Sequence, residues 1–191
     1  MKSFSSAILT AVIFCFLFLP PFAVAKEENV PSIADILITT SQTHLLLFCS
    51  IKDSFTPEMI EGVQSGIPVS FSFLIELEKI VNNWPDSTLV DMTIQHTLSF
   101  DPLKEKYQIT FSGKQDNAVT TDSLEKAIET MSDLNGTKIL SLEELEPDEP
   151  YALHVKATLA EKTLPMNMHY LVPFISLWNF ETDWRTIEFR Y

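Results

Sequence analysis

Apolar and polar residues alternate along much of the chain, which is the pattern of β-strands with one buried face. The longest such run places apolar side chains at every second position from Ile67 to Leu77, and another runs from Val90 to Phe100. Alternation predicts further strands in shorter segments, namely 35–40, 43–51, 107–111, 151–159 and 187–191.

Helical spacing is rarer. Apolar residues three and four positions apart predict a helix over 122–134, which Thr121 or Asp122 would cap and Asn135-Gly136 would end. Thr56-Pro57 begins a second helix that runs to about Gln64, because proline suits the first helical turn. Residues 141–146 predict one more turn before Pro147.

Many strands and few helices predict a mainly β protein, most simply an antiparallel β-sandwich with one or two short helices. An α+β layer is the alternative architecture. We find no internal repeat or low-complexity linker, so we expect a single domain over residues 35–191, after a flexible, polar lead-in over 26–34.

The N-terminal segment has the features of a secretory signal peptide. Lys2 precedes an apolar run from Ala7 to Leu19, and Ala23-Val24-Ala25 is a small-residue cleavage pattern. The apolar run is shorter than the roughly 20 residues that cross a bilayer as a helix. We therefore expect cleavage after residue 25 and export to the periplasm or the outer face of the inner membrane. An uncleaved segment would instead anchor the protein to the membrane.

Composition excludes several partners. The chain of 191 residues carries 13 Lys and Arg against 26 Asp and Glu, a formal net charge of −13. Such acidity opposes binding to nucleic acid or to anionic lipid. Only four glycines are present, and neither a metal motif nor a cofactor motif occurs, so we expect no cofactor and no metal. Beyond the signal segment Cys49 is the only cysteine, and it lies in an apolar run, which indicates burial rather than reactivity.

Candidate chemistry is sparse. The strand phase places His96 on an apolar face, where a histidine with a carboxylate partner acts as a base, or where it is simply a core residue with a satisfied hydrogen bond. Near the C-terminus Trp178, Phe180 and Trp184 follow the aromatic and proline-rich residues 164–174. Aromatic residues at this density form either an exposed recognition patch or part of the core.

An ordered set of short motifs resembles a bacterial family of unknown function, family 4390. The set begins at Ser65-Gly66-Ile67-Pro68 and continues through Trp84-Pro85-Asp86, Phe100-Asp101-Pro102-Leu103 and Tyr107 to Leu164-Pro165, Trp178 and Trp184. The resemblance implies an exported bacterial protein and supplies no catalytic residues. Family members are often encoded near a sensor kinase of the nitrogen-regulation type, which implies a link to envelope signalling.

These observations favour a non-enzymatic binding module in the cell envelope, with a protein or an apolar ligand as partner. His96, Trp178, Phe180 and Trp184 are the candidate binding residues. The alternatives are a hydrolase or isomerase that uses His96, and a scaffold protein anchored by an uncleaved N-terminal segment. An unpaired strand edge or an exposed apolar patch would favour the binding module.

Overall fold

The computed structural model of the protein describes residues 30–81, 85–112, 118–160, 178 and 180–191. The signal segment, Trp84 and the motif residues 164–174 lie outside these ranges. The described chain forms nine strands and two helices, with a short 3₁₀ turn η1 at Leu142–Glu144. In chain order, the strands and helices are β1 Ser32–Thr40, β2 His44–Lys52, α2 Pro57–Gln64, β3 Val69–Lys79, β4 Ser87–Asp101, β5 Lys106–Phe111, β6 Ala118–Thr121, α3 Leu124–Ser132, β7 Asp133–Ser141, β8 Pro150–Leu159 and β9 Arg185–Arg190.

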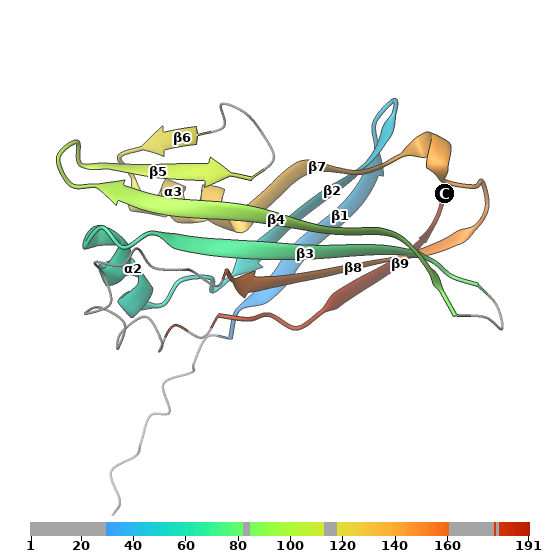
Figure 1. The fold of residues 1–191 in the computed structure, drawn as a ribbon, viewed down its shortest axis with the longest axis horizontal. Coiled ribbons are helices and arrows are strands. Elements are labelled where there is room, and N and C mark those ends of the chain that lie inside the picture. Colours follow the sequence, from blue (N-terminus) through green and yellow to red (C-terminus); the bar gives the residue numbers. More distant parts are fainter. Residues whose placement is uncertain (1–29, 82–84, 113–117, 161–177, 179) are drawn as a thin grey trace, which may run out of the picture.

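The strands form two antiparallel sheets. Sheet A has the order β1-β2-β7, and sheet B has the order β6-β5-β4-β3-β8-β9. The strands of sheet A cross behind the long strands of sheet B (Figure 1). The prediction of a mainly β, sandwich-like fold is confirmed, and the α+β layer is not observed.

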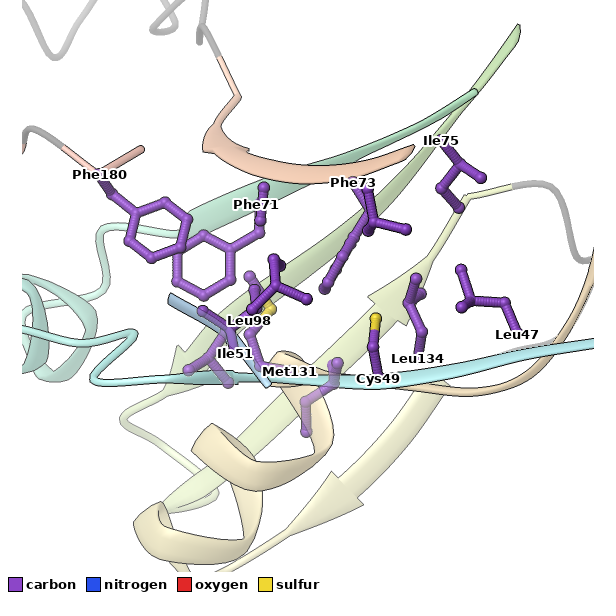
Figure 2. Close-up of a cluster of buried hydrophobic side chains, with 14 of the residues drawn as sticks. Leu47, Cys49, Ile51, Phe71, Phe73, Ile75, Leu98, Met131, Leu134 and Phe180 are labelled. Carbon is purple, nitrogen blue, oxygen red and sulfur yellow. The ribbon is translucent and has the colours of Figure 1, made fainter. Parts of the chain in front are cut away.

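The core lies between the two sheets. Buried side chains of β2, β3 and β8 belong to one hydrophobic cluster, and α3 packs against β4 and β5 of sheet B. Figure 2 shows Leu47 and Cys49 of β2 beside Leu134, with Met131 of α3 nearby. These side chains are almost completely shielded from solvent, which explains why their strands alternate so clearly.

The start of α3 differs from the prediction. The N-cap is Ser123, whose Oγ accepts a hydrogen bond from the Lys126 N–H at 3.2 Å, rather than Thr121 or Asp122. Thr121 instead ends β6, where it pairs with Tyr107 of β5. The Thr121 side chain accepts a hydrogen bond from Ser123 N–H at 3.1 Å, so it holds the turn that precedes the helix.

The expected helix stop at Asn135-Gly136 is wrong. Both residues lie inside β7, and the chain enters this strand directly after Ser132. The register shifts between the pairs Leu47–Thr137 and Cys49–Leu134, so Asn135 and Gly136 form a bulge. Gly136 has φ +66° and lies under the ring of Phe48, so the glycine serves the bulge and not a helix terminus.

Several local predictions are confirmed. Thr56 caps α2 through its side chain, Pro57 is the first helical residue, and η1 lies in the expected turn. By contrast, β1 begins at Ser32, inside the segment expected as a lead-in. No helix among the described residues is long and apolar enough to cross a membrane.

Two serines of β3 alternate with its core residues and are nevertheless shielded from solvent. Ser70 and Ser72 are buried on the side opposite the core. Ser70 Oγ lies 2.7 Å from Thr97 Oγ1, and Ser72 Oγ accepts a hydrogen bond from Gln95 Nε2 at 3.3 Å. These bonds compensate for the loss of water, so serine is tolerated there.

Candidate functional site

His96 is a buried structural residue of β4. Its Nδ1 lies 3.0 Å from the carbonyl oxygen of Met131, near the C-terminus of α3. Because a carbonyl only accepts, Nδ1 carries the hydrogen and donates it. The imidazole also packs against the rings of Phe73 and Phe111, with centroid distances of 4.9 and 4.6 Å. The ring therefore ties α3 to sheet B.

Trp178 and Phe180 belong to the core. The ring of Phe180 stacks on Phe71 at a centroid distance of 4.3 Å, as Figure 2 shows. The carbonyl of Phe180 accepts a hydrogen bond from Leu159 N–H at 2.9 Å, which aligns this segment with the end of β8. Trp178 lies against Gly62 of α2. Neither side chain offers an exposed recognition surface.

Trp184 is different, because 42% of the residue is exposed. It precedes β9, and the ammonium group of Lys156 lies 5.8 Å from its ring centroid. Lys156 also forms an ion pair with Glu181. Of the four candidate binding residues, Trp184 is the one that a partner can reach.

The structure also brings together a hydroxyl, an imidazole and a carboxylate. Thr186 Oγ1 lies 2.8 Å from Nδ1 of His154, and His154 Nε2 lies 3.5 Å from Oε2 of Glu78. This order resembles the nucleophile, base and orienting acid of some hydrolases. The three residues lie on the outer face of sheet B, on neighbouring strands β9, β8 and β3. We interpret the row as a tie between these three strands.

A pocket of about 390 Å³ lies where β3 ends and β8 begins. Its two cations already have partners. Lys79 Nζ lies 2.7 Å from Glu146 and 3.8 Å from Glu149, and Arg190 donates to the Asp148 carbonyl at 2.7 Å. A hydrogen bond with Glu146 also raises the pKa of Lys79. A pocket lined by paired charges does not suit an apolar ligand.

Among the residues that the structure describes, part of β4 forms an open strand edge. Strand β3 pairs with β4 along the whole length of β3, but β5 pairs only with the second half of β4, from His96 to Asp101. The first half, Ser87–Ile94, has no second neighbouring strand among the described residues, and we call it the β4 edge. In Figure 1, β4 extends well past the end of β5. An open strand edge presents unpaired N–H and C=O groups to a partner.

The direction of these groups follows from Gln95. Its carbonyl accepts from Ser112 N–H, and its N–H donates to Ser112 Oγ, both at 2.8 Å. Both backbone groups of Gln95 therefore point away from β3. Because alternate residues of an antiparallel strand point the same way, Thr93 and Asp91 also direct their N–H and C=O groups outward.

The other edges are better protected. Strand β1 is interrupted by a bulge at Asp35, which has φ +52°. Strand β6 has only four residues, and β9 carries Arg185 and Arg190 at its ends. Short strands, bulges and charges each hinder unwanted strand pairing. Strand β7, the other edge of sheet A, is interrupted by two register shifts against β2. The β4 edge has one irregularity, at Leu89, and pairs with β3 without interruption from Val90 to Ile94.

A signal for this edge is present in the sequence, although none of the sequence-based predictions used it. Alternation runs from Val90 to Phe100, whereas the next strand alternates only from Tyr107 to Phe111. A hairpin partner of that length covers about half of the longer strand. Which half stays open depends on the turn that joins the two strands.

The described residues form two antiparallel sheets, with an open edge on β4 and an exposed tryptophan, Trp184. The chain belongs to the family described as "Domain of unknown function (DUF4390)", whose model matches residues 29–188. This match confirms the resemblance found in the sequence. Searches of curated proteins and of solved structures find no match.

Proposed function

We propose that this protein is an exported, non-enzymatic binding module of the bacterial cell envelope, and that it binds a protein partner by strand addition at the β4 edge. A link to envelope signalling fits such a role. The observation that carries the proposal is the half of β4 that lacks a second neighbouring strand among the described residues.

Burial on the inner face of this edge supports a protein partner. Val90, Met92 and Ile94 point toward the core and pack against it, but each is only partly buried. A strand added beside them would cover the exposed part of these side chains and would satisfy the outward backbone groups of Asp91 and Thr93. Main-chain hydrogen bonds then contribute affinity, and the side chains contribute specificity.

The test is a crosslinking pull-down from the native cell envelope, with the full chain expressed as bait. We expect one stoichiometric envelope protein. A Thr93→Pro variant should lose it, because proline removes one outward N–H and leaves the pairing with β3 intact. The matched control Thr93→Val keeps the N–H and should retain the partner.

A Trp184→Ala variant separates the two exposed surfaces. Loss of the partner with Trp184→Ala but not with Thr93→Pro would move the binding site to the face around Trp184. Failure to recover any protein with several crosslinkers would contradict the binding function and would return attention to enzymatic alternatives.

Export has its own test. N-terminal sequencing of the protein recovered from the envelope should begin at Lys26. A protein that still carries residues 7–19 would support a membrane-anchored scaffold instead.

A further inference from the structure

We infer that the segment that binds the β4 edge alternates apolar and basic residues, with its basic side chains on the outer face of sheet B. This inference rests on the proposed function and adds the chemistry of the partner. It is carried by the register and the charges of β3 and β4.

The outer face at this edge is acidic. Asp91 of β4 lies directly opposite Glu76 of β3. Because the backbone groups of Asp91 point away from β3, the two residues form a non-hydrogen-bonded pair, in which side chains are closest. Two carboxylates at such positions repel each other. Among the described residues, neither Asp91 nor Glu76 forms an ion pair. The lysines and the histidine that form ion pairs are paired with other carboxylates.

A partner strand at this edge would place a side chain next to Asp91 on the same face. Lysine or arginine there would offset the repulsion between Asp91 and Glu76, whereas an acidic residue would increase it. On the inner face the partner would meet Val90, Met92 and Ile94, which favour apolar side chains. Since successive side chains of a strand point to opposite faces, the partner must alternate.

A second copy of this chain fits the edge less well. Two β4 edges could pair antiparallel with Met92 opposite Met92, which would set Asp91 opposite Thr93. That arrangement would supply no cation to either acidic pair, and it would join two chains that each carry a formal net charge of −13. Charge complementarity therefore favours a different, basic partner.

The experiment uses two labelled nine-residue peptides with blocked ends, one alternating valine with lysine and the other alternating valine with glutamate. Binding to the protein recovered from cells that express the full chain is measured by fluorescence anisotropy. We expect the lysine peptide to bind at least about fivefold more tightly at low salt, with the difference shrinking as salt is added. Hydrogen exchange should show new protection of the Asp91 and Thr93 amides.

Variants at Thr93 and Asp91 test whether the peptide binds at the β4 edge. Thr93→Pro should weaken binding of the lysine peptide at least about tenfold, and Thr93→Val should not. Asp91→Lys should reverse the preference between the peptides, and this variant serves even if the proline variant does not fold. Equal binding of the two peptides, or an unchanged preference in Asp91→Lys, would overturn the inference.

The outcomes also separate this inference from the proposed function. If the envelope pull-down depends on Thr93 but the peptides show no charge preference, strand addition stands and the basic partner is wrong. If sedimentation shows a dimer that Thr93→Pro abolishes, the edge joins two copies of this chain, and the basic partner is again wrong. If the pull-down recovers nothing, the proposed function fails first.

Discussion

The indole ring of Trp178 fills the space that a side chain on Gly62 would need. A Cβ atom at residue 62 would lie closer than 3.0 Å to Cη2 and Cζ2 of this ring. Gly62 is a buried residue of α2, so the missing side chain allows the Trp178 ring to pack onto the helix.

Gly62→Ala should therefore destabilise the protein by about 1–3 kcal/mol, through overpacking. In an exposed helix the same change would stabilise the protein by up to about 1 kcal/mol. The sign of the change in unfolding free energy therefore shows whether residue 62 is packed against Trp178. Urea unfolding followed by tryptophan fluorescence measures it, with Glu61→Ala on the exposed side of α2 as the control. In a Trp178→Leu background the cost of Gly62→Ala should fall, and equal costs in both backgrounds would contradict the contact.

Replacing His96 should lower the stability of the fold and leave binding of the partner unchanged. His96→Phe keeps an aromatic ring between Phe73 and Phe111 but leaves the carbonyl of Met131 without its donor. We expect a loss of about 1–3 kcal/mol in the free energy of unfolding, the cost of an unsatisfied buried polar group. Partner recovery by the folded variant should be unchanged. Loss of binding at unchanged stability would revive a functional role for His96.

Cys49 should be inert in the folded protein. Burial, with a smaller contribution from Asp133, raises the pKa of its thiol from 9.0 to about 12. Since the thiolate is the reactive form, carbamidomethylation at pH 8 should be at least roughly a thousandfold slower than in the unfolded chain. Mass spectrometry of the Cys49 peptide measures the rate with and without urea. Rapid labelling of the native protein would show that this part of the core opens readily.

Asp133 should make stability fall as pH rises. Partial burial, then the charges of Glu129 and Asp35, raise the pKa of the Asp133 carboxyl above its ordinary value of 3.8. The folded state therefore holds this proton more tightly than the unfolded chain does, and stability declines as pH increases from 3.8 through the raised pKa. Above that range the penalty remains constant.

Asp133→Asn should consequently raise the free energy of unfolding at pH 7, by less than about 1 kcal/mol because the group is partly exposed. The gain should shrink as pH is lowered toward 3.8. Urea unfolding at several pH values measures both effects. A gain that is independent of pH would mean that ionisation of Asp133 is not its cause.

Asp91→Asn tests whether repulsion between Asp91 and Glu76 lowers the stability of the protein. Removing one of two carboxylates that face each other across β3 and β4 should stabilise the protein by about 0.2–1 kcal/mol. Added salt should reduce the difference between the variant and the original protein. Thr93→Asn, on the same face of β4 without a charge change, is the control. Destabilisation by Asp91→Asn would indicate that Asp91 has a favourable partner.

Local patterns in the amino-acid sequence were sufficient to predict α2 and seven of the nine described strands, but not β6 and β7. Alternation found the long strands β3, β4 and β8, because each buries one side and side chains of a strand alternate between its faces. Thr56 and Pro57 were sufficient for the start of α2, because a helix cap is a local hydrogen bond. The short apolar run and small residues at the N-terminus predict export, which remains to be tested.

Contacts between distant parts of the chain determine which elements become neighbours. Asn135-Gly136 suits a helix end or a bulge equally well, and the pairing of β7 with β2 selected the bulge. Trp178, Phe180 and Trp184 look alike in sequence, yet contacts with α2 and β3 bury the first two and leave Trp184 exposed. The β4 edge likewise depends on where β5 stops pairing. Alternation reports which side of a strand is buried, but the register and the neighbours of that strand come from contacts between residues far apart in the chain.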